Sequence, residues 1–70
     1  MNTKLIASRI KEIRTTSGLT QTKFGQLLSV SQDTISLWEK GNRVPTTEFV
    51  VLIAKEFQVS SDYILGLSDY

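Results

Sequence analysis

Gln21 and Gln32 have the side chains best suited to recognition chemistry in this sequence, because an amide carries a donor and an acceptor side by side. Gln32 opens a segment of helical apolar spacing, where its amide could bond N6 and N7 of an adenine together. Gln21 opens the preceding helical segment, where it could donate to a phosphate beside the free N–H groups of a helix start. The alternative is a pair of solvated surface glutamines.

The elements that must position these amides lie between residues 18 and 43. This segment predicts a helix over about 21–28, a tight turn, and a second helix over about 32–40. Apolar residues recur at helical spacing, first at Phe24, Leu27 and Leu28 and then at Ile35 and Trp38. Thr20 and Ser31 can cap the two helix starts, and Gly18 and Gly41 can end helices. Two short helices joined by a tight turn, with polar residues near the start of the second, fit the major groove of DNA.

The same stretch resembles the helix-turn-helix of the phage Cro/repressor group, also called the Xre family. The matching residues are Thr20-Gln21, Val30-Ser31-Gln32, Thr34-Ile35-Ser36 and Trp38-Glu39-Lys40-Gly41, followed by Arg43 and Pro45. The resemblance extends from about residue 6 to residue 66, and so many matches at fixed offsets are more specific than one short motif.

Two residues depart from the family pattern. Gly25 stands where alanine is usual, and Ser29 stands where glycine is usual. A small residue at position 25 lets the two helices cross closely, although glycine costs about 1 kcal/mol of helix propensity relative to alanine. A serine at positive φ would be mildly strained, so either the turn differs slightly or Ser29 tolerates that conformation.

The resemblance implies an all-α fold, a compact five-helix domain of the lambda-repressor-like DNA-binding type over residues 1–70. It implies that the helix over 32–40 enters the major groove of a roughly palindromic double-stranded operator bound by a homodimer. It also implies that Arg14 pairs with Glu39 and that Gln21 and Gln32 hydrogen-bond each other. Of the other structural residues, we expect Trp38 in the core and Gly25 at the helix crossing.

The residues expected to contact DNA form two groups. Those facing the bases are Gln32, Asp33, Ser36 and Leu37. Those facing the phosphates are Thr20, Gln21, Lys23, Ser31, Thr34, Lys40, Asn42 and Arg43.

Four of these positions have a structural alternative. Asp33 could accept from cytosine N4, or instead stabilise the positive end of its helix. Leu37 could contact a thymine methyl group, or be an exposed apolar residue. Thr34 and Ser36 could hydrogen-bond DNA, or belong to a plain helix surface.

Apolar spacing predicts three further helices. The first covers residues 3–17, with a cap at Asn2 or Thr3 and an apolar stripe formed by Ile6, Ile10 and Ile13. The second begins after Thr46 or Thr47 and ends near residue 57, with one of two adjacent valines exposed and a core face made by Phe49, Leu52, Ile53 and Phe57. The third is short, lies between Ser60 and Gly66, and packs through Tyr63, Ile64 and Leu65. We expect little order in residues 67–70.

Charge is unevenly distributed along the chain. The net charge is +1, but residues 1–43 sum to +4 and residues 44–70 to −3. The basic half would face a polyanion, and the acidic half, in particular residues 47–66, is expected to carry the dimer surface. A solvated surface of mixed charge is the alternative.

The composition argues against several classes of protein. Without cysteine or histidine the chain has no disulfide or thiol chemistry and only carboxylates to offer a metal, so we expect no enzyme, no metal site and no cofactor. The longest apolar run, residues 49–54, is too short to cross a bilayer. With no signal pattern at the start, a cytoplasmic protein of bacterial or phage origin is expected.

A second class remains open at this point, a protein-binding regulator on the same scaffold, such as an antirepressor or an antitoxin-like partner. The low net charge, Asp33, and the apolar residues Leu27 and Leu37 favour it. Its mark would be an outward apolar patch on the helix-turn-helix that binds a second protein.

Overall fold

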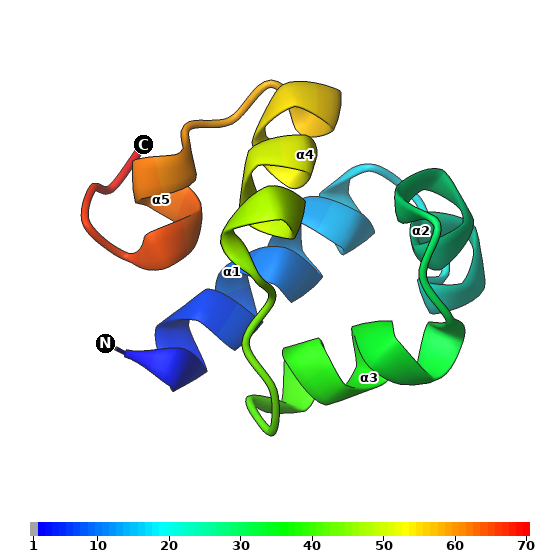
Figure 1. Ribbon diagram of the computed structural model, residues 1–70. Coiled ribbons are helices and arrows are strands. Elements are labelled where there is room, and N and C mark those ends of the chain that lie inside the picture. Colours follow the sequence, from blue (N-terminus) through cyan, green and yellow to red (C-terminus); the bar gives the residue numbers. More distant parts are fainter. Residues whose placement is uncertain (1) are drawn as a thin grey trace.

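The fold consists of five helices joined by short loops. The computed structural model describes residues 2–70, and these contain α1 (Thr3–Thr16), α2 (Gln21–Leu28), α3 (Gln32–Lys40), α4 (Thr47–Phe57) and α5 (Ser61–Leu65), without a strand. In Figure 1, α3 runs along the lower edge of the molecule, α2 closes the right side and α5 lies on the left, beside α1 and α4. The predicted all-α fold is therefore confirmed.

Helix starts are fixed by short polar side chains, as the sequence predicts. The Asn2 side chain accepts from the N–H of Leu5 at 3.0 Å, and the Thr20 hydroxyl accepts from the N–H of Lys23 at 3.1 Å. Such caps satisfy backbone donors that have no partner inside the helix. The start of α4 differs, since Thr46 makes no side-chain cap hydrogen bond there.

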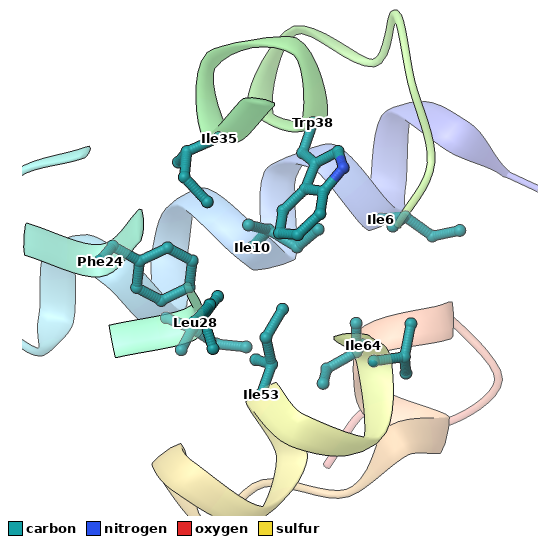
Figure 2. Packing of buried hydrophobic residues seen from close by; sticks show 10 residues of the cluster. Ile6, Ile10, Phe24, Leu28, Ile35, Trp38, Ile53 and Ile64 are labelled. Carbon is teal, nitrogen blue, oxygen red and sulfur yellow. The ribbon is translucent and has the colours of Figure 1, made fainter. Parts of the chain in front are cut away.

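One hydrophobic core joins all five helices (Figure 2). Phe24 and Leu28 from α2, Ile35 and Trp38 from α3, and side chains from α1, α4 and α5 converge on its centre. The aromatic rings pack in tilted pairs: Trp38 lies 5.4 Å from Phe49, centroid to centroid, and Phe24 lies 5.2 Å from Phe57. Trp38 is 3% exposed, so it fills the core and is withdrawn from any partner surface.

The predicted core face of α4 packs on the core, but its most buried residues include one that was not predicted. Val50 and Ile53 are its buried residues, whereas Phe49, Leu52 and Phe57 are only partly buried. All three still pack against the core, and the rings of Phe49 and Phe57 lie against those of Trp38 and Phe24, so the buried residue that the prediction missed is Val50. The expectation that one of the two adjacent valines is exposed is confirmed by Val51.

The segment after α5 is held in place, which corrects the expectation of little order. Arg9 of α1 donates to the carbonyl oxygens of Tyr63 and Ser68 at 2.5 and 2.6 Å. Its guanidinium lies 4.1 Å from the centre of the Tyr63 ring and 3.8 Å from a carboxylate oxygen of Asp69. We call these contacts the Arg9 clasp. They link residues far apart in the chain, which local sequence patterns do not reveal.

A second contact beside the clasp joins α5 to α1. The Tyr63 hydroxyl donates to the Glu12 carboxylate, and this hydrogen bond raises the pKa of Tyr63 above its ordinary value. The phenol therefore keeps its proton across the neutral range and remains a donor to Glu12.

The turn between α2 and α3 places Ser29 in the left-handed conformation, with φ of 60°. This decides between the two possibilities that the sequence left open, since the turn keeps the geometry that glycine favours and the serine adopts it. We expect Ser29→Gly to raise the free energy of unfolding by about 0.5–1 kcal/mol, because a side chain is disfavoured at positive φ. Urea denaturation would measure it, with exposed Ser8→Gly inside α1 as the control that should lose stability. A loss in both variants would contradict this reading of the turn.

Gly25 of α2 lies against the backbone of Val30 and Ser31, in the turn that leads into α3. A Cβ atom at this position would stand 2.6 Å from the carbonyl oxygen of Val30. We therefore expect Gly25→Ala to lower the free energy of unfolding by about 1–3 kcal/mol, since overpacking against backbone outweighs the gain of about 1 kcal/mol in helix propensity. The same denaturation experiment tests this, and a stabilised variant would show that the turn relaxes without cost.

Candidate nucleic-acid interface

The first turn of α3 projects polar side chains away from the core. Gln32 and Asp33 are exposed, whereas Ser36 and Leu37 are half-buried one turn further on. The buried residues of α3, Ile35 and Trp38, anchor the helix on the opposite side. The start of the helix is therefore its most accessible part.

A chain of hydrogen bonds runs from the interior to this exposed start. Glu39 receives two hydrogen bonds from Arg14, from Nε at 2.6 Å and from Nη2 at 2.9 Å. Glu39 Oε1 also accepts from Gln21 Nε2 at 3.1 Å, and Gln21 Oε1 accepts from Gln32 Nε2 at 2.6 Å. We call this series Arg14–Glu39–Gln21–Gln32 the amide relay. It connects α1, α2 and α3, and it contains both pairs that the family resemblance implies.

The inner end of the relay is shielded from solvent. The side chains of Arg14 and Glu39 are 13% and 4% exposed. Arg14 also donates to the carbonyl oxygen of Leu19 at 2.9 Å, so the loop after α1 is tied to the same pair. The hydrogen bond to Glu39 raises the pKa of Arg14 further above its ordinary value, so the guanidinium stays charged.

Several candidate phosphate ligands take part in helix caps. The Ser31 hydroxyl accepts from the backbone N–H of Thr34 at 3.2 Å and lies 3.0 Å from the Thr34 hydroxyl. The Thr20 hydroxyl caps α2. The Thr20 and Ser31 hydroxyls therefore cap the first turns of α2 and α3. The next residue after each cap is a glutamine of the amide relay.

Three cationic side chains flank this surface. Lys23 is exposed on α2, Lys40 is exposed at the end of α3, and Arg43 is exposed in the loop that follows, next to exposed Asn42. Among the described residues, none of these three makes an ion pair within 4.0 Å. Their charge is therefore available to an anion, while Asp33 is the one acidic residue in the first turn of α3.

The apolar patch expected for a protein-binding surface is only partly formed. Leu27 on α2 is 52% exposed, but Leu37 is half-buried. The backbone oxygen of Leu37 accepts from the N–H groups of Asn42 and Arg43 at 3.0 and 3.3 Å, so this part of α3 supports the following loop.

Two sets of contacts escape the sequence reasoning, one at the site and one outside it. The bond from Gln21 to Glu39 joins the two predicted pairs into one series, and no spacing in the sequence indicates it. Arg9 looks like an ordinary surface cation until the fold brings residues 63–69 beside it. Both depend on tertiary contacts between helices.

Two capped helices joined by a tight turn, with polar side chains exposed at the start of the second, are the arrangement of a helix-turn-helix protein. The chain belongs to the helix-turn-helix family, whose profile matches residues 10–64. This confirms the resemblance.

Two relatives show the range of the family. The sequence is 35% identical over 65 residues to repressor protein C2 of Salmonella phage P22, covering 93% of this chain and 30% of the repressor. It is 34% identical over 62 residues to antitoxin PezA of Streptococcus pneumoniae serotype 4, covering 89% of this chain and 39% of the antitoxin. The chain thus spans about a third of the length of these relatives, 30% of the repressor and 39% of the antitoxin.

The fold agrees with a solved structure of the same repressor. The crystal structure of the P22 c2 repressor in complex with synthetic operator 9T in the presence of Tl⁺ superposes with a TM-score of 0.84 at 32% identity, covering 94% of this chain and 100% of that chain.

Among residues 2–70, none of the helices has the length and apolar character needed to cross a membrane.

Proposed function

We propose that the chain is a sequence-specific DNA-binding regulator of transcription, which reads a double-stranded operator with α3 in the major groove. The observation that carries the proposal is the amide of Gln32, exposed at the start of α3 and held by Gln21 at 2.6 Å. A glutamine amide in this place can bond an adenine edge with two hydrogen bonds. The similarity to a repressor solved with its operator supports it.

The other proposed DNA contacts are assigned from the places of the residues on α2, on α3 and in the loop after α3. Bases are read by Gln32, Asp33, Ser36 and Leu37, and the phosphates are bound by Thr20, Gln21, Lys23, Ser31, Thr34, Lys40, Asn42 and Arg43. Each cation that displaces a counterion from DNA adds about 0.9 to the slope of log affinity against log salt. Because the proposed target is DNA, the proposal includes a cytoplasmic location for the protein.

The proposed dimer surface lies around α4 and α5. An apolar groove of about 310 Å³ is lined by Val44, Pro45, Thr47, Val50, Val51, Ser61 and Leu65. It adjoins the loop that follows α3, so a second copy seated there would bring two α3 helices toward one another across a palindromic site. The exposed Val51 would be covered in that dimer.

A second candidate function is that of a protein-binding regulator, and one observation favours it. Leu27, exposed on α2, lies on the helix-turn-helix itself, and antitoxin PezA is among the relatives. In this case the surface formed by α2 and α3 would bind a protein.

Selection from a pool of duplexes with a randomised central sequence tests the main proposal. We expect tight binding to a palindromic consensus, with an affinity that falls steeply as salt rises. Gln32→Ala should lose about 1–3 kcal/mol of discrimination at the base pair that it reads, while keeping the salt slope. Gln26→Ala, an exposed glutamine of α2, is the control. No enrichment of any sequence at low salt would reject the proposal in favour of a protein partner.

A further inference from the structure

The end of α3 rests against the start of α1. A Cβ atom on Gly41, the residue that ends α3, would stand 3.8 Å from the carbonyl oxygen of Thr3 and 3.9 Å from the Cβ atom of Ala7. In Figure 1 this contact lies toward the lower left, where α1 begins and α3 ends. Lys40, which precedes Gly41, is exposed, and so is Arg43 in the loop that follows. The start of α1 therefore lies beside two of the cations that the proposed function places on DNA phosphates.

The helical spacing of α1 sets two more cations beside this contact. Residues three and four apart are neighbours on a helix surface, so Lys4 and Lys11 both adjoin Ala7. Both lysines are exposed, and within residues 2–70 neither makes an ion pair within 4.0 Å. The one acid of α1, Glu12, is instead hydrogen-bonded by the Tyr63 hydroxyl on the side that faces α5. The side of α1 next to the end of α3 thus carries two cations and no acid of its own helix.

Lys4 stands at a place where a helix disfavours a cation. It lies in the first turn of α1, which holds no acidic residue. The free N–H groups of a first turn carry partial positive charge, so helices favour acids there and cations in the last turn. The stability of α1 therefore gives no reason for a lysine at this position. A local preference given up in this way is expected where a residue serves function.

We propose that the start of α1 is part of the DNA-binding surface, where Lys4 and Lys11 bind backbone phosphates next to those bound by Lys40 and Arg43. A lysine ammonium is a compact charge on a flexible stem, so it reaches a phosphate without a fixed angle. Phosphate contacts carry no direct base information, and these extend the contacted DNA beyond the helix-turn-helix itself. The proposal rests on the proposed function.

The salt dependence of DNA binding in Lys4→Gln and Lys11→Gln tests the proposal. On the duplex selected with the wild-type chain, each variant should reduce the slope of log affinity against log salt by about 0.9 per bound chain, since one counterion fewer is released. The affinity should fall by the same factor on the selected duplex and on a random one. The matched control is Lys55→Gln, which removes the same charge from an exposed position of α4 and should keep the wild-type slope.

Two further readouts separate a lost contact from a lost fold. In urea, followed by the fluorescence of Trp38, Lys4→Gln should be at least as stable as the wild type, because it removes a cation from the positive end of α1. Ethylation of single phosphates then locates the contacts on the DNA. We expect a set of phosphates whose ethylation weakens binding of the wild-type chain but not of the variant with both lysines replaced.

The outcomes distinguish this proposal from the proposed function. Slopes of Lys4→Gln and Lys11→Gln equal to that of Lys55→Gln would overturn the role of α1 alone. So would a loss of affinity confined to the selected duplex, because it would assign these lysines to base recognition. A wild-type chain that binds no duplex at low salt would overturn the proposed function together with this inference.

Discussion

Glu39→Ala is expected to lower the free energy of unfolding by about 3–5 kcal/mol, because it leaves the Arg14 guanidinium in a shielded place without its counter-charge. A loss of this size is comparable to the whole stability of many small domains. Trp38 is the single tryptophan and is buried, so its fluorescence during urea denaturation measures the change. The variant should be largely unfolded even at low urea.

Two further variants separate the ion pair from a general loss of charge. Glu56→Ala removes an exposed acid from α4 and should change stability by about 0.5 kcal/mol at most. Arg14→Met combined with Glu39→Leu removes both charges and should recover most of the loss, since well-packed apolar residues often replace a buried pair without cost. A Glu39→Ala variant as stable as Glu56→Ala would show that solvent reaches Arg14 easily.

Val51→Asp is expected to abolish the proposed dimer and to lower affinity for the palindromic duplex of the proposed function by about 10²–10⁴, because the second half-site would then no longer be bound by a linked partner. Val51 is 42% exposed, so the monomer should keep its fold and its tryptophan fluorescence. Sedimentation equilibrium gives the oligomeric state, and titration of the selected duplex gives the affinity.

Lys55→Glu is the control for added negative charge. It changes the net charge by two units on the same helix, and residue 55 is exposed and does not line the groove. We expect it to stay dimeric and to lose much less affinity than Val51→Asp. A Val51→Asp chain that still forms the dimer and binds as tightly as the wild type would place the interface elsewhere.

Local chemistry explains why so much of the fold was predictable. Helix starts depend on a cap within three residues, as with Asn2 and Thr20, and helix ends depend on left-handed residues such as Gly18 and Gly41. Spacing along α1 and α3 gave the buried isoleucines and Trp38. These signals all act within one or two turns of the chain.

Features that depend on several elements at once were harder to predict. On α4, Val50 is buried beside the predicted Ile53, and a single apolar stripe did not indicate it. Residues 67–70 are held in part by Arg9, which donates to the carbonyl oxygen of Ser68, 59 residues away. At the site, the resemblance supplied the two pairs of the relay, but the bond from Gln21 to Glu39 emerged only from the packing of α2 against α3.

The Arg9 clasp also bears on how the domain unfolds. A five-residue helix such as α5 is too short to be stable alone and would fray first if it rested only on α4. Arg9 ties it and the following residues to α1, which itself packs against α3. Opening α5 then means breaking bonds to the helix that supports the rest of the core. The first and last helices therefore belong to one cooperative unit, and α5 gains a share of the global stability that its own length could not provide.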